Sequence, residues 1–393
     1  MKLAIVTARY GREVLGGAET LARELAIHLP RPQFKVDVLT TCAVDLETWR
    51  NELPAGPAVI DEVPVRRFPI DHRFRDARRF RELQFQFATG QPATRDDEYA
   101  WIDHSAHSPA LYAYLAQHGR DFDYLVFAPY LFGPTLYGTQ LWPERSVLWP
   151  CLHDEVYARF FHVRLMLEAC RGLLFITEPE RRLALKTLGI RQPRAEVVGL
   201  GVDDFTAQAD RFRQQFGLSE PLLLYAGRFD STKNLLHLFE FFTEYKRLRP
   251  DPLKLVLLGS GPLTPPPHPD IISLGFVREA DKRDAFAAAT VVCQPSVWES
   301  FSIVLMEAWL AGTPALVHGD CEVTREHVRR SHGGLYYTTF DEFAGALDWL
   351  LAHPLERQKL GQQGRAYVLR EYNWPRVIDR FRDALTAWQD VTP

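Results

Sequence analysis

Two glutamates, Glu299 and Glu307, are the side chains of this 393-residue chain whose spacing most clearly indicates chemistry. Glu299 stands just before a predicted helix, for which Ser302 is a suitable N-cap, and Glu307 lies inside that helix. Eight helical residues span about 12 Å, which suits a ligand with hydroxyl groups at both ends and phosphates between, such as a sugar diphosphate joined to a ribose. The alternative is a capping acid and a solvated helix acid, but Glu307 interrupts the apolar run IVLMEAWL, where an unpaired acid is costly.

Three glycine-containing loops follow predicted strands and could bring backbone close to an anionic ligand. The pair Gly16–Gly17 precedes a predicted helix, whose first N–H groups lack partners within the helix. Gly227 opens the loop GRFDSTKN, in which Arg228 and Lys233 could neutralise a diphosphate. Gly259 begins the third loop, GSGP. Each loop is also compatible with an ordinary turn, and none matches the dinucleotide-binding pattern GxGxxG.

The composition describes a globular protein and excludes several classes. Apolar residues make up 46% and charged residues 24%, and a net charge of −4 argues against a nucleic-acid partner, which normally requires a basic excess. The five cysteines are dispersed without metal-binding spacing, which fits free thiols in a reducing cytosol. Because the sequence shows no signal peptide and no apolar run of about 18 residues, we expect a cytoplasmic protein that at most rests on the inner face of the membrane.

Two sets of short apolar strands, separated by helical stretches, must position these side chains. The first set is Lys2–Thr7, Phe34–Leu39, Tyr124–Phe127, Ser146–Trp149, Leu173–Ile176 and Glu196–Val198, and the second is Leu222–Tyr225, Leu253–Leu258, Ile271–Leu274, Thr290–Cys293 and Pro314–Val317. This alternation predicts an α/β chain with two doubly wound domains. We expect the domains at residues 1–203 and 204–371, with a C-terminal helix in 372–393 that packs back on the first. Thr41–Gln117 is the exception, because it shows few clean strand signals.

Nine short motifs follow one another along the chain, with the glutamate pair near their centre. They are GGAE (Gly16–Glu19), HD (His153–Asp154), GVD (Gly201–Asp203), GR…KN (Gly227–Asn234), GSGP (Gly259–Pro262), GFV (Gly275–Val277), E-x7-E (Glu299–Glu307), AGTP (Ala311–Pro314) and YNW (Tyr372–Trp374). In this order they resemble the motifs of glycosyltransferase family 4, a retaining family among the glycosyl transferases of group 1. The resemblance covers nearly the whole chain and implies the GT-B fold, in which two Rossmann-like domains face a central cleft.

The resemblance implies a role for each matching residue. The catalytic residues that it implies are His153, Arg228, Lys233 and Glu299, and the donor-binding residues are Gly16, Gly17, Gly227, Arg228, Lys233, Gly259, Val277, Glu299, Ser300, Phe301, Ser302 and Glu307. In this scheme the two cations neutralise the leaving diphosphate. Glu307 would hold the ribose hydroxyls and Glu299 the hydroxyls of the donor sugar, while His153 would lie near the reacting carbon.

The reaction implied by the resemblance is transfer of a sugar from a UDP- or GDP-linked donor to a glycan or lipid-linked acceptor. It would retain the anomeric configuration by front-face attack, need no metal or further cofactor, and serve cell-surface polysaccharide or glycoconjugate synthesis. Two positions depart from the family pattern: Ser300 stands where a glycine is frequent, and Leu200 where an asparagine is frequent. A GT-B-fold nucleotide-sugar epimerase and a non-catalytic donor-binding subunit are the alternative functions.

A basic segment, Arg66–Arg81, is the candidate contact with the acceptor or with a membrane. It holds seven arginines interleaved with three phenylalanines. Such a segment could dock on anionic lipid headgroups or on a lipid-diphosphate acceptor, whereas a solvated basic helix is the alternative interpretation. We also predict that Trp101, Tyr130 and Asp154 lie on the acceptor side.

Overall fold

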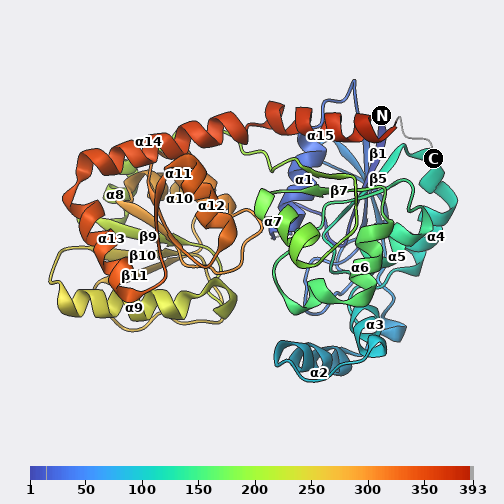
Figure 1. Cartoon of the computed structure of the whole chain (residues 1–393), viewed down its shortest axis with the longest axis horizontal. Helices are drawn as coiled ribbons and strands as arrows, with labels where there is room; N and C mark the ends of the chain where they lie inside the picture. Colours follow the sequence, from blue (N-terminus) through green and yellow to red (C-terminus); the bar gives the residue numbers. More distant parts are fainter. Residues whose placement is uncertain (15, 390–393) are drawn as a thin grey trace. The chain divides into compact units, whose positions relative to one another are not determined.

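The computed structural model in Figure 1 describes residues 1–14 and 16–389, which fold into two compact units. Unit 1 contains the chain up to Leu200 and residues 377–389, and unit 2 is Gly201–Arg376. Each unit is built on its own sheet, mostly parallel in unit 1 and parallel throughout in unit 2, with helices on both faces. The prediction of an α/β chain with two doubly wound, Rossmann-like domains is therefore confirmed.

The sheet of unit 1 has the strand order β3-β4-β2-β1-β5-β6-β7-β8 within the described residues. Its strands are β1 (Lys2–Thr7), β2 (Lys35–Thr41), β3 (Gly56–Ile60), β4 (Val63–Phe68), β5 (Tyr124–Ala128), β6 (Ser146–Leu148), β7 (Gly172–Phe175) and β8 (Ala195–Val197). The pairs are parallel except for β3 with β4. The central strands are continuous apolar runs because helices cover both faces of a parallel sheet, and β5 is buried along its whole length.

The helices of unit 1 follow these strands. They are α1 (Gly17–His28), η1 (His72–Phe74), α2 (Ala77–Ala88), α3 (Arg95–Asp103), α4 (Pro109–His118), η2 (Gly119–Asp121), α5 (Gly133–Leu141), η3 (Val156–Arg159), α6 (Phe161–Ala169), α7 (Glu178–Arg182) and η4 (Leu183–Thr187). Helices α2 and α3 lie together, away from the sheet (Figure 1).

The stretch Thr41–Gln117 is more regular than the sequence suggested, and that expectation was wrong. It contains the antiparallel hairpin β3–β4 and helices α2, α3 and α4. Strand β3 is half-exposed at the sheet edge, so it lacks the apolar signal of a central strand. The helices do carry start signals: Asp76 caps α2 and Thr94 forms a capping box with Asp97 at α3.

The sheet of unit 2 is parallel throughout, in the order β11-β10-β9-β12-β13-β14. Its elements are β9 (Leu222–Ala226), β10 (Lys254–Leu258), β11 (Ile271–Gly275), β12 (Val291–Gln294), β13 (Ala315–His318) and β14 (Gly334–Tyr337), with α8 (Ala209–Phe216), η5 (Ser231–Lys233), α9 (Leu235–Leu248), α10 (Glu279–Ala288), α11 (Ile303–Leu310), α12 (Glu322–Ser331), α13 (Phe340–Ala352) and α14 (Pro354–Glu371). Strand β14 was not predicted, because the short edge segment GLYY is only partly buried.

The last described helix, α15 (Trp374–Gln389), belongs to unit 1 from residue 377 onward. Its Phe381 ring packs 6.1 Å from the ring of Phe34 and 6.0 Å from that of Trp149. Tyr124 also donates a hydrogen bond of 2.8 Å from its hydroxyl to the carbonyl of Leu385. Residues 390–393 of the predicted C-terminal segment lie outside the described residues. None of the helices described is both long and apolar enough to cross a membrane.

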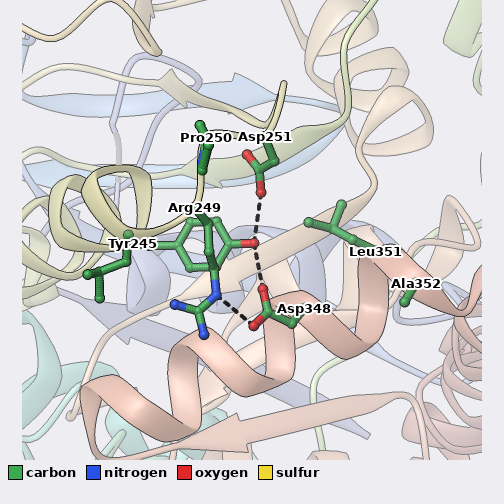
Figure 2. Close-up of a pocket in the computed structure, with 8 residues that line it drawn as sticks. Tyr245, Arg249, Pro250, Asp251, Asp348, Leu351 and Ala352 are labelled. Carbon is green, nitrogen blue, oxygen red and sulfur yellow. Dashed lines mark hydrogen bonds and ion pairs between the residues drawn. The ribbon is translucent and has the colours of Figure 1, made fainter.

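A shallow hollow in unit 2 lies between the end of α9 and the end of α13 (Figure 2). There the buried hydroxyl of Tyr245 is 2.8 Å from Asp251 Oδ2 and 3.0 Å from Asp348 Oδ1, and Arg249 pairs with Asp348. Asp251 precedes β10, so the hollow lies at the amino-terminal edge of the parallel sheet, whereas open α/β sheets bind ligands at the carboxyl edge. This network joins two helices and a strand, and its role is structural.

Replacing Tyr245 with phenylalanine is expected to lower the free energy of unfolding by about 1–2 kcal/mol, because both carboxylates lose their hydroxyl donor. Urea denaturation measures the change. Tyr336→Phe is the matched control, since that ring is half-exposed on β14. Equal unfolding midpoints for wild type and both variants would contradict the structural role of the Tyr245 hydroxyl.

Candidate functional site

The ion pair between Lys233 and Glu299 joins two loops at the carboxyl edge of the unit 2 sheet. Lys233 ends η5, which follows β9, and Glu299 follows the neighbouring strand β12. Their Nζ and Oε1 atoms are 2.7 Å apart. The Asp230 carboxylate shapes the lysine loop by accepting the Lys233 backbone N–H at 3.2 Å. Two residues predicted from separate motifs therefore meet in one site.

Arg228 lies in the same loop as Lys233 but has a different partner. Its guanidinium Nη2 is 2.8 Å from Asp230 Oδ2, and its side chain is 69% exposed. The Tyr225 hydroxyl donates to the Arg228 carbonyl at 2.8 Å, which fixes the backbone beneath the side chain. A fixed backbone with an exposed guanidinium suits a residue that contacts an anion from solution.

The glycines of the second and third loops are required by close backbone packing. A Cβ atom on Gly259, whose φ is +128°, would lie 1.9 Å from the carbonyl oxygen of Gly227. The Gly227 N–H also donates to the carbonyl of Leu258 at 2.9 Å. A Cβ atom on Gly227, whose φ is +155°, would lie 2.7 Å from the Tyr225 hydroxyl, so both predicted glycines have a structural explanation. The backbone contacts also bring the loops after β9 and β10 together.

Ser302 occupies the N-cap position of α11, but its side chain does not cap the helix. Its backbone is left-handed, with φ 69°, and its Oγ accepts a hydrogen bond of 3.2 Å from Gln294 Nε2. The expectation of a serine side-chain cap was therefore wrong. Because no side-chain oxygen caps it, the first turn of α11 keeps N–H groups for another acceptor.

Glu307 is paired with a lysine that sequence reasoning missed. Lys282 of α10 places Nζ 2.8 Å from Glu307 Oε1 and 3.0 Å from Glu279 Oε2. The Glu307 side chain is only 13% exposed, and burial raises its pKa although Lys282 opposes that shift. The second oxygen, Oε2, is buried and has no hydrogen-bond partner among the described residues. This is the acid that the apolar run IVLMEAWL indicated would need a partner.

The loop between Glu299 and α11 is held in place by the packing of its Phe301 side chain. Phe301 is buried and packs edge-on against Tyr372, with ring centroids 5.0 Å apart, and against His327, at 5.5 Å. Its neighbour Ser300 is partly buried. Val277, on the loop after β11, is also partly buried and packs on a core cluster of the sheet. The loop that carries Glu299 is thus held by aromatic packing rather than free in solvent.

Gln294, the last residue of β12, is the second residue that sequence reasoning missed. Its amide Nε2 donates to Glu299 Oε1 at 2.9 Å and to Ser302 Oγ at 3.2 Å. A polar residue that ends the apolar run VVC was the available signal.

In unit 1, Gly16 and Gly17 stand at the start of α1 beside a buried ion pair. A Cβ on Gly16 would lie 2.1 Å from Glu19 Oε2, so the glycine is needed for packing. The Glu19 carboxylate pairs with Arg9, whose Nη2 is 2.5 Å from Oε1, and both side chains are almost fully buried. The last residue of the motif GGAE, Glu19, therefore has a structural role in a buried ion pair.

His153 and Tyr130 converge on one carboxylate in unit 1. His153 Nδ1 is 3.7 Å from Glu155 Oε1, and the Tyr130 hydroxyl donates to the same oxygen at 2.8 Å. Burial raises the pKa of Tyr130, so its hydroxyl stays protonated. The neighbouring Asp154 instead pairs with Arg159 at 2.5 Å.

A buried acid holds the backbone next to His153. Glu180 accepts the N–H groups of Leu152 and Ile176, each at 2.8 Å. Burial raises the pKa of Glu180 to about 7 despite these bonds. Glu180 thereby ties the loop after β6 to the loop after β7.

Trp101 is more enclosed than the sequence suggested, and the arginines of the basic segment mostly have partners within unit 1. Trp101 is 6% exposed, and its ring stacks between those of Phe80 and Tyr157, with centroid distances of 5.5 Å and 4.4 Å. The ring therefore contributes to the packing of unit 1. Most arginines of Arg66–Arg81 already have partners in unit 1: Tyr114 for Arg66, Asp71 for Arg73, backbone carbonyls for Arg75, Glu82 for Arg78 and Asp97 for Arg79. Arg73 and Arg78 nevertheless keep most of their side chains exposed to solvent.

Residues 207–367, nearly all of unit 2, match the family model described as glycosyl transferases group 1. Unit 2 is a glycosyl transferases group 1 domain. The chain is therefore a glycosyltransferase, as the sequence predicted, and the Lys233–Glu299 pair, the loops of Gly227 and Gly259 and α11 lie within the matched residues.

Known proteins resemble both the group 1 domain and the rest of the chain. An uncharacterized glycosyltransferase of Methanocaldococcus jannaschii is 23% identical, with 96% of each chain covered. The solved sucrose-phosphate synthase of Thermosynechococcus elongatus has a TM-score of 0.72 at 18% identity, covering 98% of this chain and 99% of that one. Anabaena HepE, solved in complex with UDP-glucose, has a TM-score of 0.70 at 16% identity, covering 98% and 100%. These structures share the GT-B fold with the chain.

Proposed function

We propose that the chain is a retaining glycosyltransferase of family 4 that transfers a sugar from a UDP- or GDP-linked donor to a glycan or lipid-linked acceptor. One observation carries the proposal. In the group 1 domain, Lys233 pairs with Glu299 in the loop that precedes α11, and the buried Glu307 lies on that helix. Two carboxylates, with a cation paired to the first, match a donor that carries phosphates between two sets of hydroxyl groups.

The donor-side chemistry follows from these contacts. Arg228 and Lys233 neutralise the diphosphate, whose charge grows as the bond to the sugar breaks, so they stabilise the transition state more than the bound donor. Glu307 Oε2 accepts hydrogen bonds from the ribose, and Glu299 accepts them from the donor sugar. From unit 1 we assign Gly16, Gly17 and His153 to the donor sugar and phosphate, as the family resemblance implies.

The proposed reaction needs no covalent intermediate and no metal. Front-face attack puts the acceptor hydroxyl and the leaving diphosphate on the same face of the sugar, so the configuration at the anomeric carbon is retained. Positioned cations and exclusion of water then supply the stabilisation. Cell-surface polysaccharide or glycoconjugate synthesis is the proposed setting. Contact between Arg66–Arg81 and an anionic membrane stays a prediction that liposome sedimentation would test.

The proposal is tested by incubating the protein with UDP- and GDP-linked sugars and candidate acceptors. We expect release of the nucleoside diphosphate and a glycosylated product whose anomeric configuration, determined by NMR, equals that of the donor. A product with inverted configuration would exclude the retaining mechanism. Conversion of the donor into a different nucleotide sugar would instead identify an epimerase.

Replacing Lys282 with methionine is expected to move the acid limit of donor binding to higher pH. Glu307 must be ionised to accept from two hydroxyl groups, and Lys282 is the main group that lowers its pKa. Without Lys282 that pKa rises further, so binding is lost earlier as the pH falls, by about tenfold per pH unit below the pKa. Calorimetric titration with UDP and GDP at several pH values measures the shift.

The control for this experiment is Lys254→Met, which removes a lysine paired with Asp270 elsewhere in unit 2. It should leave the pH dependence of nucleotide binding unchanged. Identical pH profiles for Lys282→Met and wild type would show that Glu307 does not bind the nucleotide in its ionised form.

A further inference from the structure

Gln294 contacts the carboxylate of the Lys233–Glu299 ion pair. It ends β12, is 4% exposed, and reaches Glu299 Oε1 and Ser302 Oγ through the same amide nitrogen, Nε2. A carboxylate can only accept hydrogen bonds, so the amide nitrogen and not the oxygen must face Glu299. The contact is therefore a donated hydrogen bond to the carboxylate of a proposed sugar-binding residue.

Lys233 and Gln294 both bond to the same carboxylate oxygen of Glu299, Oε1. Lys233 Nζ lies 2.7 Å from Oε1 and Gln294 Nε2 lies 2.9 Å from the same atom. A carboxylate oxygen accepts about two hydrogen bonds, so Oε1 is fully used. The second oxygen, Oε2, makes no hydrogen bond to any described residue. This leaves Oε2 as the atom of Glu299 that can accept from a ligand.

The two neighbours differ in what happens when an anion arrives. Lys233 is a flexible point charge with its side chain 27% exposed, and a diphosphate would draw its ammonium away from Glu299. Gln294 is neutral, buried and on a strand of the sheet, so a phosphate offers it no comparable gain. Once Lys233 turns to the phosphate, Gln294 is the remaining partner of Oε1 among the described residues.

We propose that Gln294 is a positioning residue that holds the Glu299 carboxylate when Lys233 engages the donor diphosphate, so that Oε2 stays available to the hydroxyl groups of the donor sugar. This inference rests on the proposed function. It adds a division of roles: the lysine serves the leaving group, and the glutamine keeps the sugar-binding carboxylate in place. Through Ser302 Oγ the same amide also fixes the residue before α11.

Two substitutions test the proposal. Gln294→Met keeps the volume and removes the donor, and Gln294→Glu keeps the shape but places a second carboxylate against Glu299. In both variants we expect kcat with UDP-glucose or GDP-mannose, whichever the wild type uses, to fall by about ten- to a hundredfold, because a small misplacement at the reacting sugar has effects of that size. The affinity for free UDP or GDP should stay within about twofold, since a nucleotide without sugar does not need Glu299.

The pH profile separates positioning from a general loss of structure. When the introduced carboxyl of Gln294→Glu is protonated, its O–H can donate to Glu299 as the amide did, so its activity relative to wild type should rise as the pH falls. Gln294→Met cannot recover in this way. Gln362→Met, which changes an exposed glutamine of α14, should match wild type throughout.

Three results would overturn the proposal, and they differ from failure of the proposed function. The first is unchanged kcat and donor KM in both variants. The second is a parallel loss of thermal stability and of UDP or GDP affinity, which would make Gln294 a structural residue. The third is a pH profile of Gln294→Glu parallel to that of Gln294→Met. Failure of the wild type itself to bind UDP, GDP or their sugars would instead reject the function on which the inference rests.

Discussion

Replacing Lys233 with alanine is expected to lower kcat by at least about tenfold while the fold stays intact, because the transition state loses a cation at the leaving diphosphate. The side chain is partly exposed and its ion pair is with Glu299, which keeps its bond to Gln294 in the variant. The substitution therefore removes charge without leaving an unpaired buried acid. Steady-state kinetics with the preferred donor measure the effect, and circular dichroism reports the fold.

Arg228→Ala should act in the same direction, since the exposed guanidinium lies in the same loop. The control is Lys359→Ala, which removes an exposed lysine of α14 and should leave kcat unchanged. If neither Lys233→Ala nor Arg228→Ala changes turnover, these residues do not neutralise the diphosphate. If only one does, the other merely supports the loop.

Replacing Glu307 with glutamine is the second change with a large expected effect. The amide keeps the shape but loses the charge and one accepting oxygen, so the ribose loses a charge-assisted hydrogen bond worth about 1.5–3 kcal/mol. The KM for the donor and the dissociation constant of the free nucleoside diphosphate should both rise by about ten- to a hundredfold. Turnover at saturating donor should change much less, because the ribose is bound equally in the ground and transition states.

Competitive inhibition by UDP or GDP measures this loss directly. Lys282 retains Glu279 as a partner, which limits the structural damage in the variant. Glu244→Gln on the exposed face of α9 is the matched control and should leave the inhibition constant unchanged. An unaltered inhibition constant in Glu307→Gln would remove Glu307 from the nucleotide site.

The sequence predicted the donor-side elements well because each depends on local chemistry. The runs that became β9 and β12 are apolar and short, as buried parallel strands are, and charged loops follow both. The position of Glu307 in an apolar run correctly indicated that the acid needs a partner. The sheet order then brings Lys233 and Glu299 together, 66 residues apart in the chain.

Other features could not be predicted, since they arise from contacts between distant segments. Nothing near Glu307 points to Lys282, which comes from a separate helix. Gln294 gains its importance only when the loop folds back over β12. Trp101 lies in a weakly patterned stretch, and it is buried by rings from two other segments, Phe80 of α2 and Tyr157 of η3. The left-handed backbone of Ser302 likewise has no signature in its residue type.

The most direct test of the account is thermal unfolding in the presence of UDP-, GDP- and dTDP-linked sugars, with wild type and Glu307→Gln in parallel. Because a ligand that binds only the folded state stabilises it by mass action, at least one donor should raise the Tm of wild type. The same donor should give a much smaller rise in Glu307→Gln. A folded wild-type protein whose Tm no nucleotide sugar changes, or equal shifts in both proteins, would contradict a donor site built on Glu299 and Glu307.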